Sequence, residues 1–249
     1  MFRLHMRVAP YHEFEALPFG SSTQLFVLTG AGISAESGIQ TFRDSNGLWE
    51  QYDVRQVASP SGWAQNPALV WRFYSQRRAQ ARETRPNAAH VALAKLQARW
   101  ENQVFLCTQN VDPLHEHAGS PAVVHMHGEL FKSRCEREHA PPFLDESLYL
   151  NSDQLPRCDC GAGIRPHICW FGEVPFFMGE IERALSRCNL MVTIGSSGSV
   201  YPAAGFVAAA RANGAKTVYV GPERPENATA FDECRLGTAT EVVPSLFES

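Results

Sequence analysis

The sequence predicts an α/β fold in which a doubly wound parallel sheet carries helices on both faces and a smaller lobe is inserted. Short, continuously apolar runs alternate with segments of helix length along most of the 249 residues. Unbroken apolar runs are typical of parallel strands covered on both sides, and their alternation with helices is typical of the α/β class. A glycine-rich turn directly follows the first apolar run, at 25–30, which makes the expected sheet Rossmann-like.

Short local signals predict the individual elements. The expected strands are the apolar runs 25–30, 103–110, 122–128, 190–195 and 216–221. The expected helices are 66–82, 87–100, 179–188 and 202–214. Asn66 and Pro67 form a typical helix start, and Gly214 forms a typical helix end. Residues 129–169 contain four cysteines and are expected to hold little regular structure.

The elements divide the chain into a leader at 1–22, whose order stays open, and a single domain at 23–249 with two lobes. The large lobe comprises about 23–44, 86–128 and 170–249. The small lobe comprises a helical module at about 45–85 and a cysteine-bearing module at about 129–169. Ligands of doubly wound sheets bind outside the carboxyl ends of the strands, so the residues that follow those ends are the first candidates for a site.

The composition excludes several classes of protein. Hydrophobic residues make up 44% and charged residues 19%, which is typical of a globular chain. The net charge of −4 argues against binding nucleic acid through surface charge, so no direct nucleic-acid partner is expected. No apolar run reaches 18 residues, and the first twenty residues lack the apolar core of a secretory signal. We therefore expect a cytoplasmic protein without a membrane partner, whose seven cysteines are not structural disulfides.

The segment 30–35, Gly-Ala-Gly-Ile-Ser-Ala, matches the pattern G-x-G-x-x-A of dinucleotide-binding turns. The first glycine permits a tight turn, and the second lets the backbone approach a pyrophosphate. The alternative is that these glycines only end a strand for steric reasons. A dehydrogenase also needs an acidic residue at the end of a second strand, roughly 20 residues on. Glu50 has that spacing without a strand and Asp44 comes too early, so hydride transfer is not favoured.

Five motifs carry a resemblance to a known family. They are "GAGISAESGIQTFRD", "TQNVDPLHEHAG", "HMHGEL", "RPHICWFGE" and "GSSGSVYPAAGF", and together they span about residues 25–210. In this order they resemble the sirtuins, which are NAD-dependent protein lysine deacylases. The resemblance implies that the chain cleaves nicotinamide from NAD and transfers an acyl group from lysine to ADP-ribose. NAD would then be the cofactor, and proteins with acylated lysines would be the partners.

The same resemblance implies a set of residues that bind NAD. They are Gly30, Ala31, Gly32, Ala35, Phe42, Arg43, Asp44, Gln109, Asn110, Asp112, Gly195, Ser196 and Ser197. Phe42 would cover the nicotinamide pocket. An amide side chain and a carboxylate suit the nicotinamide carboxamide, which offers both a donor and an acceptor. Asp112 could equally cap a helix. The family usually has a small or flexible residue where this chain has Pro113, and we expect an altered rate rather than lost function.

His127 matches the catalytic histidine of the family, with Asn110 and Asp112 as the other implied catalytic residues. A histidine titrates near neutral pH, so it can accept a proton from a ribose hydroxyl. His125 is the competing candidate, because it lies two residues earlier and on the same face of a strand. The match to H-G-x-L selects His127.

Two groups of residues are implied to bind the acylated substrate. The segments that would enclose the peptide as an added strand contain Trp170, Phe171, Gly172, Glu173 and Val200. Tyr74 and Arg77, three residues apart on one helix face, resemble the mark of sirtuins that remove succinyl and malonyl groups. A guanidinium can donate two parallel hydrogen bonds to a carboxylate, and a phenol hydroxyl can donate a third. The alternative is a solvated basic face, because further arginines lie nearby at 72, 78 and 82. Acetyl-lysine could still be accepted.

Sirtuins carry a structural zinc on two Cys-x-x-Cys pairs, which implies a zinc-ribbon-like module. Here the pairs are incomplete and leave three candidate ligands, Cys135, Cys158 and Cys160. Glu138 or His139 could be the fourth ligand. Alternatively the site binds metal weakly, or the module has lost its metal. The other cysteines, at 107, 169, 188 and 234, lie in apolar segments and are expected in the core.

Two other functions compete with the deacylase. A mono-ADP-ribosyltransferase would use the same cleavage of NAD with another nucleophile. A catalytically weak protein would only bind NAD or acyl-lysine. Release of nicotinamide separates the enzymes from the binding protein, and loss of the acyl group from lysine separates the deacylase from the transferase.

Overall fold

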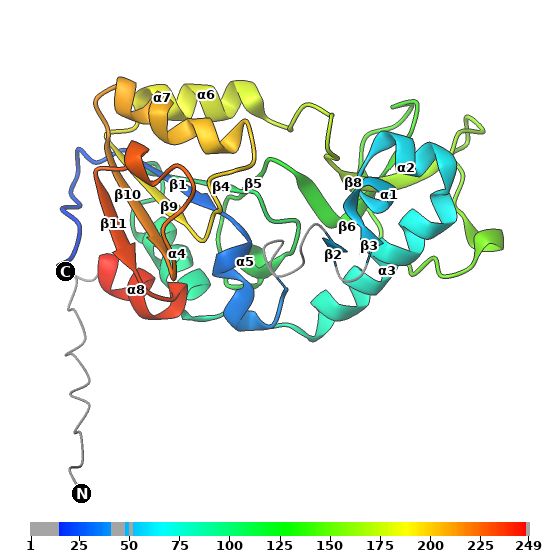
Figure 1. The fold of residues 1–249 in the computed structure, drawn as a ribbon, viewed down its shortest axis with the longest axis horizontal. Coiled ribbons are helices and arrows are strands. Elements are labelled where there is room, and N and C mark those ends of the chain that lie inside the picture. Colours follow the sequence, from blue (N-terminus) through cyan, green and yellow to red (C-terminus); the bar gives the residue numbers. More distant parts are fainter. Residues whose placement is uncertain (1–14, 41–47, 50–51, 248–249) are drawn as a thin grey trace, which may run out of the picture.

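The computed structural model describes residues 15–40, 48–49 and 52–247, and its larger part is built on a six-stranded parallel sheet (Figure 1). The strands are β1 (Leu25–Thr29), β4 (Val104–Thr108), β5 (Val124–His125), β9 (Leu190–Ile194), β10 (Lys216–Gly221) and β11 (Glu233–Leu236). Their order is β11-β10-β9-β1-β4-β5. The chain thus starts in the middle of the sheet and winds outward in both directions, which confirms the doubly wound fold.

Helices cover both faces of this sheet, as Figure 1 shows. Helices α4 (Ala88–Arg99) and α8 (Ala239–Leu246) pack on one face, and α6 (Met178–Arg187) and α7 (Phe206–Ala212) pack on the other. Successive side chains of β1 alternate between these two cores: Val27 contacts the first, and Phe26 the second. Both cores bury apolar side chains, which is why the strands are continuously apolar in sequence.

A second group of elements lies beside the large sheet (Figure 1). Its helices are α1 (Val54–Val57), α2 (Pro60–Gln65) and α3 (Pro67–Glu83), and its strands are β2 (Leu48–Trp49), β3 (Tyr52–Asp53), β6 (Gly128–Cys135), β7 (Phe143–Leu144) and β8 (Ile164–Ile168). Strands β7, β6 and β8 form an antiparallel sheet. This group has its own core, which includes Trp71, Tyr74 and Trp170.

The antiparallel sheet makes the expectation of little regular structure at 129–169 wrong. Strand β6 spans Gly128–Cys135, and β8 spans Ile164–Ile168. β6 buries only some of its side chains, so its sequence mixes apolar and charged residues. Such a half-buried strand gives no continuous apolar run, which is the signal used for the other strands.

Most expected elements occur within one or two residues of their predicted bounds. Helix α3 begins where Asn66 accepts a hydrogen bond from the amide of Leu69 at 3.0 Å, with Pro67 as its first residue. The expected helix at 202–214 opens with a 3-10 turn, Ala203–Gly205, before α7. The expected strand at 122–128 is divided between β5 and the start of β6, which belong to different sheets.

The described chain ends lie together at the amino edge of the large sheet. The amide of Leu17 donates to the carbonyl of Leu246 at 2.8 Å, and Leu17 is buried. The ring of Phe19 packs against Trp100, with the ring centroids 5.2 Å apart. Residues 15–22, the described part of the expected leader, are therefore packed against the domain. Within the described ranges, no helix is both long and apolar enough to cross a membrane.

Candidate functional site

The segments that follow four strands meet at the carboxyl edge of the large sheet. The segments are the 3-10 turns η1 (Ala31–Ile33) and η2 (Ala35–Ser37) after β1, the loop 109–113 after β4, residues 126–127 after β5, and residues 195–197 after β9. Hydrogen bonds link them in pairs: Gly32 to Gly195, Gln109 to Ser196 and His127 to Gln109. The candidate NAD-binding residues that follow these strands, so far as the structure describes them, are thus brought to one place.

The glycine turn after β1 interlocks with the turn after β9. A Cβ atom on Gly30 would lie 2.8 Å from the carbonyl oxygen of Gly195, and one on Gly32 would lie 2.7 Å from its Cα. Gly195 itself has φ +64°, which favours glycine, and a Cβ there would lie 2.5 Å from the amide nitrogen of Ile33. The glycines are therefore required by backbone contact between two loops. This steric role was one of the two alternatives raised by the sequence.

Asn110 and Asp112 are buried and joined through Ser34. The side-chain Nδ2 of Asn110 donates to the carbonyl of Gly30 and to the hydroxyl of Ser34, both at 3.2 Å. The Ser34 hydroxyl in turn donates to a carboxylate oxygen of Asp112 at 3.1 Å. The other carboxylate oxygen accepts from the amide of Leu114, at the start of α5 (Leu114–His117). Burial raises the pKa of Asp112.

The Asp112 carboxylate thus accepts from the first amide of α5, as a helix-capping side chain does, and it also lies among the other candidate site residues. Its role in binding NAD stays a prediction. Pro113 precedes the first residue of α5. A proline is tolerated there because the first amide groups of a helix have no partner within the helix.

His127 is held in one tautomer. Its Nδ1 lies 3.0 Å from the carbonyl oxygen of Gln109, so Nδ1 carries the hydrogen and donates it. Nε2 is then an unprotonated base in the neutral ring. Burial lowers the pKa of His127 below its ordinary value of 6.5, which the hydrogen bond to Gln109 only partly opposes. The ring is therefore neutral at neutral pH and can accept a proton.

The remaining predicted NAD residues differ in how far the structure describes them. The side chain of Gln109 donates to the Ser196 hydroxyl at 2.9 Å, and the Ser197 hydroxyl lies 2.7 Å from that of Ser199. Ala31 is partly buried and Ala35 is exposed. Phe42, Arg43 and Asp44 lie outside the described residues.

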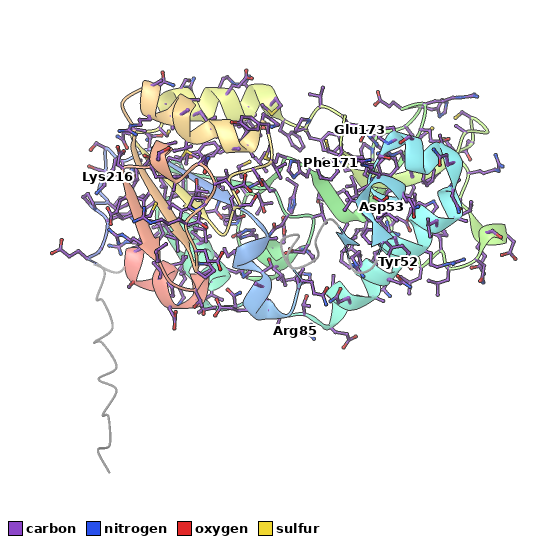
Figure 2. All side chains as sticks on the ribbon, in the orientation of Figure 1. Tyr52, Asp53, Arg85, Phe171, Glu173 and Lys216 are labelled. Carbon is purple, nitrogen blue, oxygen red and sulfur yellow. The ribbon has the colours of Figure 1, made fainter. Side chains whose placement is uncertain are left out.

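The segment 170–173 lies between the two groups of elements, as the labels of Phe171 and Glu173 in Figure 2 show. The carboxylate of Glu173 accepts from Arg165 at 2.6 and 3.0 Å and from the amide of Trp170 at 2.8 Å. Glu173 therefore holds the backbone of this segment in place. Phe171 leaves 52% of its surface exposed, beside Gly172, whereas Trp170 is buried.

Tyr74 and Arg77 lie on the inner side of α3. Tyr74 is fully buried, and its hydroxyl accepts a hydrogen bond from the indole of Trp170 at 3.0 Å. Burial raises the pKa of Tyr74, so the phenol keeps its hydrogen. The guanidinium of Arg77 lies 4.9 Å from the ring centroid of Phe73, and partial burial lowers its pKa to about 10. Arg77 is still a cation at neutral pH.

The neighbouring Arg78 shows that the arginines of α3 do not all face solvent. It is fully buried, and its guanidinium lies 3.2 Å from the carboxylate of Asp145. It also donates to the carbonyls of Leu130 and Ser147 at 2.9 and 2.8 Å. Arg72 and Arg82 are exposed, as expected of solvated charges.

Three cysteines gather at the end of β6 and in the turn before β8. The sulfur atoms of Cys135, Cys158 and Cys160 all lie within 4.8 Å of one another, and those of Cys135 and Cys160 are 3.6 Å apart. Ligands about 2.3 Å from a tetrahedral zinc lie about 3.8 Å from each other, so the cluster fits this metal. His139 Nδ1 lies 3.8 Å from the Cys158 sulfur. The exposed side chain of Glu138 instead approaches Arg134, at 4.0 Å.

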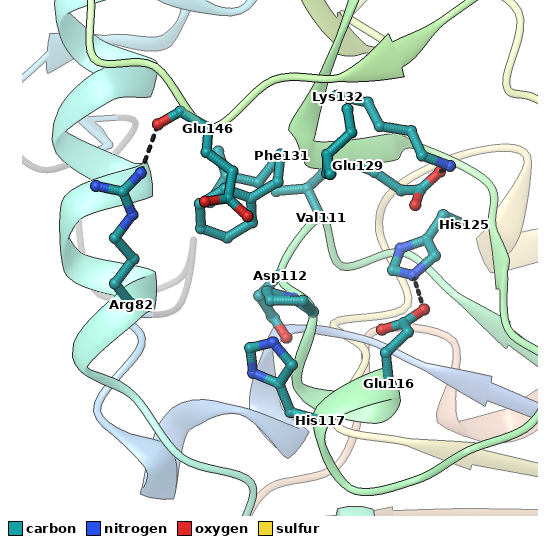
Figure 3. Close-up of a pocket in the computed structure, with 13 residues that line it drawn as sticks. Arg82, Val111, Asp112, Glu116, His117, His125, Glu129, Phe131, Lys132 and Glu146 are labelled. Carbon is teal, nitrogen blue, oxygen red and sulfur yellow. Dashed lines mark hydrogen bonds and ion pairs between the residues drawn. The ribbon is translucent and has the colours of Figure 1, made fainter.

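Sequence reasoning did not anticipate the contacts of His125. Its Nδ1 lies 3.0 Å from the carbonyl oxygen of Asn110, and its Nε2 lies 2.7 Å from a carboxylate oxygen of Glu116. Both residues border a pocket of about 320 Å³ between α3, α5 and β6 (Figure 3). The spacing His-x-His was the only signal, and it did not reveal which acceptor each ring would meet.

Comparison with known proteins gives the family. The family model described as "Sir2 family" matches residues 30–202, which is more than half of the chain. An NAD-dependent protein deacylase of Caulobacter vibrioides is 54% identical over 229 residues, which cover 90% of this chain and 95% of that protein.

Solved structures agree with this result. A Sir2 homologue in complex with NAD has a TM-score of 0.81 and 37% identity, covering 89% of this chain and 87% of that one. A Sir2 mutant with a p53 peptide and NAD has a TM-score of 0.77 and 31% identity, covering 89% and 91%. The five motifs, the doubly wound sheet and these matches show that the chain belongs to the Sir2 family.

Proposed function

We propose that this chain is an NAD-dependent protein lysine deacylase whose preferred acyl groups carry a carboxylate, as succinyl and malonyl groups do. The deacylase activity is the one named for relatives such as that of Caulobacter vibrioides. When bound, NAD supplies the ribose that accepts the acyl group and gives up its nicotinamide. The residues gathered at the carboxyl edge of the sheet hold NAD, and acylated-lysine proteins are the substrates.

His127 is the base of the reaction. Its hydrogen bond to the Gln109 carbonyl leaves Nε2 free to accept a proton, and its lowered pKa keeps the ring neutral at neutral pH. A ribose hydroxyl of NAD is the proton donor that this base suits. Asn110 and Asp112 are fixed by Ser34, so they meet the cofactor without having to be ordered first.

The preference for acidic acyl groups rests on the position of Tyr74 and Arg77. The phenol accepts the Trp170 bond and so keeps its own hydrogen as a donor. Arg77 is a cation that is partly withdrawn from water, and a carboxylate is the partner that a desolvated guanidinium favours. Because Tyr74 is fully buried, an acyl carboxylate reaches its hydroxyl only after side chains around it move.

The test compares two peptides of one sequence, acetylated and succinylated on the same lysine, by mass spectrometry after incubation with NAD. The variants are Tyr74→Phe, Arg77→Met and His127→Ala. Arg72→Met is the matched control, because Arg72 is an exposed arginine on the same helix. We expect Arg77→Met to lower kcat/KM for the succinyl peptide by about 10- to 100-fold, with little change for the acetyl peptide.

Each outcome bears on a different part of the proposal. Equal losses for both peptides in Arg77→Met would show that this residue does not recognise the carboxylate. Loss of activity in Arg72→Met would contradict the assignment to one helix face. A wild-type chain that releases nicotinamide but leaves the acyl group on lysine would support ADP-ribosyl transfer. A chain that releases no nicotinamide is not the proposed enzyme.

We also infer that Cys135, Cys158, Cys160 and His139 hold a structural zinc. The three sulfur atoms lie within 4.8 Å of one another, close enough for a single zinc ion, and the His139 ring lies 3.8 Å from the Cys158 sulfur. Metal analysis should find one zinc per chain. His139→Ala should weaken zinc retention against a chelator more than Glu138→Ala does. Equal retention in both variants would exclude His139 as a ligand.

A further inference from the structure

Two histidines hold two successive carbonyl groups of the loop after β4. His127 Nδ1 lies 3.0 Å from the Gln109 carbonyl oxygen, and His125 Nδ1 lies 3.0 Å from the Asn110 carbonyl oxygen. A carbonyl only accepts, so Nδ1 carries a hydrogen in both rings. The rings differ at their second nitrogen. His125 Nε2 lies 2.7 Å from a carboxylate oxygen of Glu116, whereas no such partner fixes His127 in the described chain.

The contacts of His125 favour a protonated ring. Nε2 faces a carboxylate, which also only accepts, so both ring nitrogens donate and the imidazole is a cation paired with an anion. Burial alone would lower the pKa of His125, but the hydrogen bond and the charge of Glu116 raise it above the ordinary value of 6.5. The same pairing lowers the pKa of Glu116 against the opposing effect of burial. The pKa values of the two histidines are therefore shifted in opposite directions, so His125 holds a second ring proton more readily than His127 does.

Titratable groups face His125 from three elements. They are His115, Glu116 and His117 of α5, Asp112 of the loop before it, and Glu129 and Lys132 of β6. Among these groups, and within the part of the chain that the structure describes, only Glu116 makes a hydrogen bond with the ring; Glu129 is paired with Lys132 instead, at 2.7 Å. The Glu116 side chain is 41% exposed and borders the pocket of Figure 3, so solvent protons reach the pair.

The pair joins both ends of the loop that carries Asn110 and Asp112. On one side His125 donates to the backbone carbonyl of Asn110. On the other side Glu116 belongs to α5, whose first amide donates to the carboxylate of Asp112. The ring of His125 thus connects the start of the loop to the helix that follows it. Figure 3 shows the bond between His125 and Glu116 on the side of the pocket formed by α5.

We propose that His125 and Glu116 form a positioning pair that fixes the 109–113 loop and so holds Asn110 and Asp112 in the geometry that binds NAD. The inference rests on the proposed function, because it assigns the loop to the NAD site. Neither residue touches the reacting atoms. The pair acts through backbone, so its loss weakens NAD binding more than it slows the chemical step.

Four variants test the pair: His125→Ala, His125→Asn, Glu116→Gln and, as the matched control, Glu129→Gln, which alters another acid of the same pocket. The asparagine amide can replace Nδ1 but cannot reach Glu116. The glutamine amide can donate to a neutral His125, so Glu116→Gln keeps a hydrogen bond without needing a proton. Initial rates over a range of NAD concentrations give kcat and KM, and thermal unfolding checks that each variant folds.

We expect His125→Ala to raise KM for NAD by about tenfold, with a smaller change in kcat. His125→Asn should recover part of that loss, and Glu129→Gln should behave as wild type. In the wild type, KM for NAD should rise as the pH rises through the raised pKa of His125, because the pair loses its proton there. Glu116→Gln should remove this alkaline rise.

Different results would contradict the positioning role of His125 and Glu116 and the proposed deacylase function. If the wild type releases nicotinamide and His125→Ala has an unchanged KM for NAD, the pair has no positioning role. If Glu116→Gln keeps the wild-type pH profile, the pH dependence of KM does not come from the proton held between His125 and Glu116. Should His125→Ala fail to fold, the pH profile of Glu116→Gln decides, because Glu116 is exposed enough for the substitution to be tolerated. A wild type that releases no nicotinamide overturns the proposed function itself.

Discussion

The hydroxyl of Tyr74 and the indole nitrogen of Trp170 lie 3.0 Å apart, and both side chains are buried. Tyr74 belongs to α3, whereas Trp170 follows β8 and opens the segment in which Phe171 is exposed. The bond therefore ties the helix that carries Arg77 to a segment that we assign to the substrate. A change at either residue is expected to affect both stability and acyl selectivity.

Tyr74→Phe removes the acceptor of the Trp170 bond and leaves a buried indole N–H without a partner. The free energy of unfolding should fall by about 1–3 kcal/mol. Urea unfolding followed by Trp fluorescence measures this change. The double variant Tyr74→Phe, Trp170→Phe should lose less unfolding free energy than the two single variants lose in sum, because the indole donor is then removed together with its acceptor. Additive losses would show that the bond contributes nothing to stability.

Gly195→Ala should disrupt the contact between the loops after β1 and β9. A Cβ atom there would lie 2.5 Å from the backbone of Ile33, and the positive φ disfavours alanine in addition. We expect a loss of about 1–3 kcal/mol in stability together with weaker NAD binding. Gly179→Ala is the control, because its Cβ would be 3.6 Å from the end of the Arg183 side chain. Equal effects of both substitutions would refute the close approach.

The rate should depend on pH through His127. The neutral ring is the base, so kcat/KM falls as the pH falls through the pKa of His127, and burial places that pKa below 6.5. The acidic limb of a plot of kcat/KM against pH should therefore lie below pH 6.5. An acidic limb above pH 6.5 would contradict the assignment. His127→Ala should have no limb of this kind in its residual activity.

Arg78→Met should be among the most destabilising substitutions in the chain. It would leave the carboxylate of Asp145 buried without its cation, and a broken buried ion pair costs about 3–5 kcal/mol. Arg82→Met, on the exposed side of the same helix, should change stability by less than about 0.5 kcal/mol. The midpoints of urea unfolding compare the two. Similar midpoints would mean that the Arg78 pair is not a structural requirement.

Acid should destabilise the fold through buried neutral histidines. Burial lowers the pKa of His90 and of His167 to about 4, below the value of about 6.5 in an unfolded chain. The unfolded state therefore binds more protons between these values, and stability falls as the pH falls from about 7 to 4. Each histidine contributes a slope of at most about 1.4 kcal/mol per pH unit. Urea unfolding at pH 7 and pH 5 measures it, and His167→Gln should flatten the dependence.

The sequence predicted the large sheet and the placement of the site because both depend on local signals. β1 and β9 are buried on both faces, so their runs are apolar throughout. The motif residues follow strand ends, and parallel strands bring those ends to one edge. Asn110, Asp112 and His127 were therefore placed together before any contact was known.

The elements that were missed lack such signals. β11 has four residues and includes Glu233 and Arg235, and α8 contains Pro244. The burial of Arg78 depends on Asp145, which comes from a segment without regular structure. The partner of His125 depends on how α5 lies against β5. Side-chain pairs between distant segments depend on tertiary packing, and local sequence patterns do not predict them.

The hydrogen bond between Leu17 and Leu246 has a practical consequence for attaching the protein to a surface or to a fusion partner. Both residues lie at the amino edge of the parallel sheet, and the interlocked glycine turns lie at the opposite edge. A label or anchor placed beside Leu17 or Leu246 therefore leaves the edge that we assign to NAD facing outward. Immobilised protein should accept large acylated substrates as readily as the free protein does.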